Sequence, residues 1–139
     1  MRTFVVAALL LAATVAWAQE RAPSAAGAEV YIISPKDGAK VSGPIVVRFG
    51  LKGMGIAPAG IKLENTGHHH LLIDTAAPSD LSAPLPSSEK VVHFGKGQTE
   101  TTLTLPPGKH TLQLLLGDAG HVPHDPAVIS KKITITVTK

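Results

Sequence analysis

The sequence predicts an all-β protein, an immunoglobulin-like antiparallel β-sandwich of about seven strands. Nearly every apolar segment after residue 28 alternates with period two, which is typical of half-buried strands and not of helices. Eleven prolines and thirteen glycines separate these segments in a chain of 139 residues. Seven short strands within about 110 residues fit a two-sheet sandwich. The expected strands are 29–33, 44–51, 67–74, 89–94, 99–105, 109–116 and 129–138.

The first four strands are separated by segments rich in turn-forming residues. Residues 34–38 (SPKDG) follow the first strand, and their Pro, Asp and Gly favour a turn. The strand 44–51 (PIVVRFGL) places Ile, Val, Phe and Leu at alternate positions. Two long connections flank 67–74: 52–66 contains three glycines and one proline, and 75–88 contains three prolines. Loops of that length in a compact domain are usually functional or cover a sheet edge.

The last three strands show the same alternation. A Pro-Pro-Gly-Lys turn precedes the strand 109–116, in which leucines occupy alternate positions 112, 114 and 116. In 129–138 the run ITITVT alternates apolar residues with threonine. The segment 117–128 that joins these two strands is the third long connection.

We expect three parts in the chain: a secretory signal peptide at 1–18, a flexible leader at 19–28 and one β-sandwich domain at 29–139. Arg2 precedes an apolar stretch, and Ala16-Trp17-Ala18 fits the small-x-small rule for cleavage. The apolar stretch is short for a transmembrane span, and no later segment reaches that length, so we expect no membrane span after cleavage. The signal predicts a periplasmic or secreted protein.

Composition excludes several classes of site. Cysteine is absent, which excludes disulfides, thiolate metal sites and a lipid anchor on cysteine. The formal net charge of +3 is spread along the chain, and Lys131-Lys132 is the sole adjacent basic pair, so we expect no nucleic-acid partner. Histidine is abundant instead, with seven copies against five Phe, Tyr and Trp together.

Two histidine segments converge in the predicted topology. Strand directions place the connections 52–66 and 117–128 at the same end of the sandwich, because the third and sixth strands of an immunoglobulin-like sheet pair antiparallel. His68 to His70 begin the third strand, and His121 and His124 lie in the 117–128 connection. The histidines of the two segments are therefore expected to meet.

The spacing of these histidines suits a metal site. His68 and His70 point to the same side of a strand with their Cβ atoms about 7 Å apart. A proline between His121 and His124 stiffens their loop and reduces the entropy lost on binding. Imidazole suits Cu(II), Zn(II) and Ni(II), and the affinity order favours copper. We therefore expect Cu(II) or Zn(II) to be held by His68, His70, His121 and His124.

Three nearby residues are further candidates. Asp118 and Asp125 can accept a hydrogen bond that orients an imidazole, or can themselves be oxygen ligands. Met54 lies in the connection 52–66 at the same end, so its thioether is a further possible ligand.

The other three histidines are interpreted separately. His69 shares a strand face with Leu71 and Ile73, so we expect a partly buried structural histidine with hydrogen-bond partners. His93 lies near the same end, but its sheet is not fixed by the sequence, and its role as a ligand stays open. His110 follows the Pro-Gly turn at the opposite end and is expected to be structural.

One alternative topology would separate the two histidine segments. If Asn65-Thr66-Gly67 forms a tight hairpin turn, residues 60–64 become a strand, and His68 to His70 move to the opposite end of the sandwich.

Four segments of the chain carry a family resemblance. These are GMGIAPAG (53–60), GHHHLLID (67–74), HFGKGQTE (93–100) and GDAGHVPHDP (117–126). Together they resemble a family of small exported bacterial proteins classed as a domain of unknown function, number 4399, over about residues 45–138. That family has no established activity. The resemblance therefore implies one domain whose function is carried by these loops.

We expect a periplasmic metal-binding module for storage, delivery or sensing, with an envelope protein or a metal-delivery protein as partner. The alternative is a non-enzymatic envelope binding or adhesion module without metal, whose histidines donate hydrogen bonds or respond to pH. The sequence argues mostly against an enzyme, because it lacks the nucleophile-elbow, zinc-protease and phosphate-loop motifs. Metal hydrolase chemistry at a three-histidine site stays open, although no acidic base can be assigned.

Overall fold

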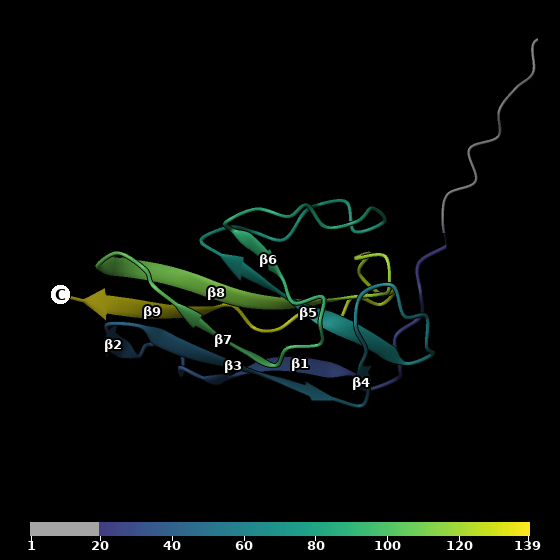
Figure 1. The fold of residues 1–139 in the computed structure, drawn as a ribbon, viewed down its shortest axis with the longest axis horizontal. Helices are drawn as coiled ribbons and strands as arrows, with labels where there is room; N and C mark the ends of the chain where they lie inside the picture. The colour runs from purple at the N-terminus through teal and green to yellow at the C-terminus, as the bar shows by residue number, and fades with distance from the viewer. Residues whose placement is uncertain (1–19) are drawn as a thin grey trace, which may run out of the picture.

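Two β-sheets pack face to face in residues 20–139, the part of the chain that this computed structural model describes (Figure 1). The signal peptide expected at 1–18 lies outside the described residues. Within residues 20–139 there are nine strands and no helix. The fold is an all-β, immunoglobulin-like sandwich, as the alternation of apolar residues predicts. No helix that could span a membrane occurs in the described part of the chain.

The two sheets differ in size. The smaller sheet is antiparallel and has the order β1-β3-β7, and the larger has the order β2-β9-β8-β5-β4 with β6 also paired to β5. The strands of the smaller sheet are β1 (Glu29–Ser34), β3 (Ile45–Lys52) and β7 (Glu100–Leu103). Those of the larger sheet are β2 (Lys40–Ser42), β4 (Gly55–Ile56), β5 (Thr66–Ile73), β6 (Val91–His93), β8 (Gly108–Gly117) and β9 (Ile133–Thr138).

All seven expected strands are present, and two short ones were not expected. β2 pairs parallel with β9, and β4 pairs parallel with β5. The last strand begins at Ile133 and not at residue 129. Ser130 explains this shorter strand, because its backbone N–H donates to the Leu114 carbonyl and its hydroxyl accepts from the Leu114 N–H. The chain therefore leaves the regular ladder at this point.

The main core lies between the sheets, where the alternating apolar residues of both sheets meet. Its fully buried members include Val47 from β3, Leu71 from β5, Leu112 and Leu114 from β8, and Ile135 from β9. A second, smaller cluster of Leu72, Leu85, Val91 and Leu115 lies on the outer face of the larger sheet. Figure 1 shows the connection between β5 and β6 above that face. β5 is therefore buried on both sides.

The direction of β5 brings the histidine segments together. β5 runs antiparallel to β8, with His68 opposite Gly117. The convergence predicted from topology is confirmed. The alternative hairpin is wrong, because residues 60–64 form no strand and Gly55 pairs in parallel with Thr66.

The segment 20–28, whose composition predicts a flexible leader, contacts the domain. Pro23 forms an isolated parallel bridge with Asp125, and the Ser24 N–H donates to the Asp125 carbonyl. Composition did not predict these contacts, which attach the segment to the end of the sandwich that holds the histidines.

Candidate metal centre

Three imidazole rings converge at this end of the larger sheet. Nδ1 of His121 lies 2.9 Å from Nε2 of His68 and 3.2 Å from Nε2 of His70. One ligand atom from each residue lies within 4.8 Å of those of the other two. A single Nδ1 offers either one hydrogen atom or one lone pair, so it cannot make two full hydrogen bonds. These three histidines form a cluster that could hold a metal ion.

Two of the three nitrogen–nitrogen separations match those of ligands on one metal ion, and the third is no longer than 4.8 Å. Two imidazole nitrogens bound at about 2.0–2.1 Å, with angles between about 90° and 109°, lie about 2.8–3.4 Å apart. The 2.9 and 3.2 Å distances in the cluster fall within that range. The 2.9 Å distance corresponds to an angle near 90°, as in square-planar Cu(II), and the 3.2 Å distance to a wider angle nearer the tetrahedral value of Zn(II), so the distances select neither ion.

Strand geometry and loop cover explain the burial of two of these rings. His68 and His70 alternate with His69 along β5 and share the outer face of the sheet with Leu72. The side chains of both are 0% exposed. Nδ1 of His68 has no hydrogen-bond partner among residues 20–139, so the only polar contact of this ring in that part of the chain is the one from Nε2 to His121.

The third ring is placed by a tight turn after β8. His121 has φ of 65°, a left-handed conformation that costs a residue with a side chain about 1 kcal/mol or more. Asp118 stabilises the turn, because its Oδ1 accepts from the N–H groups of Gly120 and Val122 at 2.8 and 2.9 Å. The His121 carbonyl accepts from the Leu85 N–H at 2.9 Å. Asp118 therefore fixes the position of His121 through hydrogen bonds to the backbone on either side of it, and not through a hydrogen bond to the His121 imidazole.

Two glycines leave room for the rings. A Cβ at Gly117 would lie 2.4 Å from Cε1 of His70, and one at Gly67 would lie 2.8 Å from Cε1 of His124. Neither distance is possible without displacement of the ring. Sequence reasoning missed these glycines, although each lies at the edge of a histidine segment.

The environment keeps the three imidazoles neutral. Burial, followed by the neighbouring imidazoles, lowers the pKa of His68 to about 4 and that of His70 to about 2. Burial and the nearby His93 also lower the pKa of His121. Neutral imidazole is the form that binds metals, so the site needs little deprotonation at neutral pH.

His93 lies beside the cluster. It is directly opposite His70 in the pairing of β6 with β5, and the two ring centroids are 4.4 Å apart. Its Nε2 lies 3.0 Å from the Pro86 carbonyl, an acceptor, so Nε2 carries the hydrogen. The larger sheet therefore holds His93, a point that the sequence left open. The three-nitrogen cluster does not include it.

The structure does not bring His124 into the cluster. Its Nε2 lies 3.0 Å from the Thr66 carbonyl, and the side chain is 1% exposed. Asp125 also points elsewhere, with Oδ1 3.8 Å from Nη1 of Arg21. Met54 packs against the main core on the other face of β5. None of these three candidates lies among the converging nitrogens.

The remaining histidines belong to the framework. His69 packs on Phe49 with ring centroids 5.1 Å apart, on the core face as expected. The hydrogen-bond partners expected for it are missing, because neither ring nitrogen has one among residues 20–139. At the opposite end, His110 contacts Oδ2 of Asp74 and the Pro106 carbonyl, both at 2.7 Å.

The chain is similar to known proteins at the level of a family and of solved structures. A family model described as "Domain of unknown function (DUF4399)" matches residues 47–138. No curated protein matches the chain. Among solved structures, the chain is similar to an endo-β-1,4-mannanase from Thermotoga petrophila, with 18% identity, TM-score 0.48 and 81% of this chain covered. It spans 20% of the mannanase chain. Fibronectin(III)-like modules of CbhA from Clostridium thermocellum are 13% identical, with TM-score 0.38 and 78% and 92% of the two chains covered.

Proposed function

The chain belongs to the DUF4399 family, a domain of unknown function, and from that premise we propose that it is a binding module for a divalent transition-metal ion. The ligands are Nε2 of His68, Nε2 of His70 and Nδ1 of His121. One observation carries the proposal: two buried imidazoles aim at the same nitrogen of a third, at 2.9 and 3.2 Å. A cation shared by three lone pairs resolves this arrangement, which hydrogen bonds alone satisfy only in part.

Copper(II) and zinc(II) are the ions we propose. Three nitrogen ligands without sulfur favour these borderline ions over the softer Cu(I), and the affinity order places Cu(II) above Zn(II). Three protein ligands leave a further coordination position free, which suits a module that must release or transfer its metal.

We further propose that the module acts in the periplasm or after secretion, in metal storage, delivery or sensing. The charged and apolar pattern of residues 1–18 supports export, and residues 29–139 provide one sandwich domain. An envelope protein or a metal-delivery protein is the partner that this role requires.

Calorimetric titration of the protein without an affinity tag tests metal binding. We expect a dissociation constant of about 1 μM or tighter for Zn(II) and tighter still for Cu(II). His121→Gln should weaken binding strongly, because it removes one of three ligands, and the change is tolerated by the fold because His121 is only partly buried. His110→Gln, at the opposite end of the sandwich, is the matched control and should bind as the wild type does.

A third variant distinguishes two ligand sets. His124→Gln should leave the affinity unchanged if the three converging nitrogens are the ligands. An effect as large as that of His121→Gln would instead support the four-histidine site expected from the sequence. Binding weaker than about 1 μM for both ions would exclude the proposed function.

A second candidate is an envelope binding module without metal. A cavity of about 410 Å³ lies beside the 118–120 turn, and among its lining residues Ile61 and Leu63 are 53% and 64% exposed. Exposed apolar side chains beside a cavity favour contact with a partner. Capture of an envelope protein that survives chelator and the His121→Gln change would support this candidate over the metal site.

A further inference from the structure

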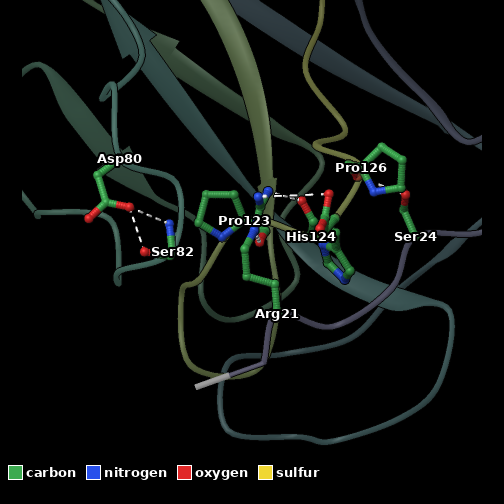
Figure 2. A network of polar contacts seen from close by, with 8 residues as sticks. Arg21, Ser24, Asp80, Ser82, Pro123, His124 and Pro126 are labelled. Carbon is green, nitrogen blue, oxygen red and sulfur yellow. Dashed lines mark hydrogen bonds and ion pairs between the residues drawn. The ribbon is translucent and has the colours of Figure 1, made fainter. Parts of the chain in front are cut away.

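The N-terminal segment of the described chain is tied to the loop that carries His121. We call residues 21–24 the strap. Figure 2 shows Arg21 reaching the backbone of Pro123 and His124. Its Nε donates to the Pro123 carbonyl at 3.0 Å, and its Nη2 donates to the His124 carbonyl. Its side chain is 19% exposed, so these bonds are largely shielded from water.

The backbone of the strap continues the contact. The Asp125 N–H donates to the Ala22 carbonyl at 2.9 Å, and the Ser24 N–H donates to the Asp125 carbonyl at 3.2 Å. The Ser24 hydroxyl donates to the Pro126 carbonyl at 2.7 Å, as Figure 2 also shows. Four successive residues of the loop, 123–126, are thus held by one short segment that lies about 100 positions earlier in the chain.

The loop needs this support because His121 is strained. Its left-handed φ of 65° persists only where surrounding contacts fix the backbone. The Asp118 side chain holds the first part of the turn, and the Leu85 N–H holds the His121 carbonyl. The strap holds the part that follows, beginning two residues after His121.

Polar contacts, more than packing, secure the strap. Ala22 and Pro23 line the cavity of about 410 Å³ that separates the strap from Ile61 and Leu63. Part of the strap therefore faces open space and not a packed core. Removal of the two hydrogen bonds that the Arg21 guanidinium donates would leave only the backbone hydrogen bonds and that of the Ser24 hydroxyl to hold the strap.

We propose that Arg21 is a positioning residue of the metal centre. By holding the backbone of Pro123 and His124, it keeps Nδ1 of His121 close to Nε2 of His68 and Nε2 of His70. This inference rests on the proposed metal-binding function. It predicts that metal affinity depends on a residue that contributes no ligand.

Zinc titration of Arg21→Gln tests the inference. We expect binding roughly tenfold weaker than in the wild type, as for other residues that orient metal ligands. Arg48→Gln is the matched control, because Arg48 forms an exposed ion pair with Glu100 on the smaller sheet and should bind normally. Arg21→Lys keeps the charge but not the two-pronged fork, so it should bind as weakly as Arg21→Gln.

A spectroscopic readout separates positioning from general destabilisation. The visible absorption of bound Co(II) should change in Arg21→Gln and remain that of the wild type in Arg48→Gln. Wild-type affinity with an unchanged Co(II) spectrum in Arg21→Gln would overturn the inference. Full recovery in Arg21→Lys would also overturn it, because charge alone would then suffice.

Two further measurements cover the remaining outcomes. If Arg21→Gln fails to fold, Ser24→Ala removes only the bond to Pro126 and should still weaken binding two- to threefold, whereas unchanged binding would count against the strap. If the wild type binds no metal, the proposed function fails by itself. The effect of the strap on the loop is then measured in the metal-free protein. There Arg21→Gln should speed amide hydrogen exchange at Asp125 and shift the NMR resonances of the His121 ring. Unchanged exchange and resonances would reject it.

Discussion

Gly117→Ala should disable the metal centre without removing a ligand. The added Cβ would lie 2.4 Å from Cε1 and 3.0 Å from Nδ1 of His70. Ordinary carbon contacts are about 3.5–4.0 Å, so the ring must retreat by about 1 Å. Metal–ligand distances tolerate only about 0.2 Å. His70 Nε2 would therefore leave the position it shares with His68 and His121.

The expected cost has two parts. Zn(II) affinity should fall by at least about tenfold, because displacement of one ligand leaves two. The free energy of unfolding should fall by about 1–3 kcal/mol, the usual cost of an overpacked interior. The ring centroids of His70 and His93 are 4.4 Å apart, so His93 limits how far the His70 ring can move.

The assay pairs calorimetric titration with urea unfolding followed by circular dichroism. Gly55→Ala is the matched control at the same end of the sandwich, because its Cβ would lie 3.6 Å from Cγ2 of Thr66, an ordinary contact. It should keep wild-type affinity and change stability by less than about 0.5 kcal/mol. Wild-type affinity and stability in Gly117→Ala would refute both the placement of His70 and its role as a ligand.

Three other predictions concern the histidines as structural groups. Because burial lowers the pKa values of His68 and His69 to about 4 and that of His70 to about 2, the unfolded chain takes up their protons first, below about pH 6.5. Stability measured by urea unfolding should therefore fall as pH drops from about 6.5 toward 4, by up to about 1.4 kcal/mol per pH unit for each histidine; a flat profile would contradict their burial as neutral rings. The bond to Asp74 raises the pKa of His110, so its contribution is full below about pH 6.5 and is lost as pH rises through the raised value. His110→Gln should accordingly cost about 1 kcal/mol at pH 5.5 and less at pH 8.5, and an equal cost at both values would argue against a charged pair. Finally, His69→Leu should raise the free energy of unfolding by about 1 kcal/mol or more, since both ring nitrogens are buried without partners, and a loss of stability would reveal a partner for this ring.

The fold and the place of the site follow from local patterns. Alternation fixes which residues of β5 share a face, so His68 and His70 could be paired, and His69 grouped with Leu71 and Ile73, from spacing alone. The antiparallel pairing of β5 with β8 follows from the topology of this class of sandwich, and it brings His121 to the same end.

Other features depend on contacts that no local pattern encodes. His121 and His124 are three residues apart in a loop, and only the left-handed turn at His121, with its bonds to Asp118, decides which ring reaches the cluster. The position of His93 depends on whether its short strand joins β5, and three residues of alternating pattern cannot decide that. The contacts of Arg21 connect positions about 100 residues apart.

By itself, the sequence determined an all-β sandwich, the absence of thiolate chemistry and one end rich in histidine, because periodicity, composition and strand order are properties of the chain. Only the tertiary structure decided that the converging nitrogens belong to His68, His70 and His121, and that Gly117 and the strap lie where they can control two of them. The physical reason is distance. A metal site requires atoms placed to within a few tenths of an ångström, and that placement comes from long-range packing and from the dihedral angles of one loop.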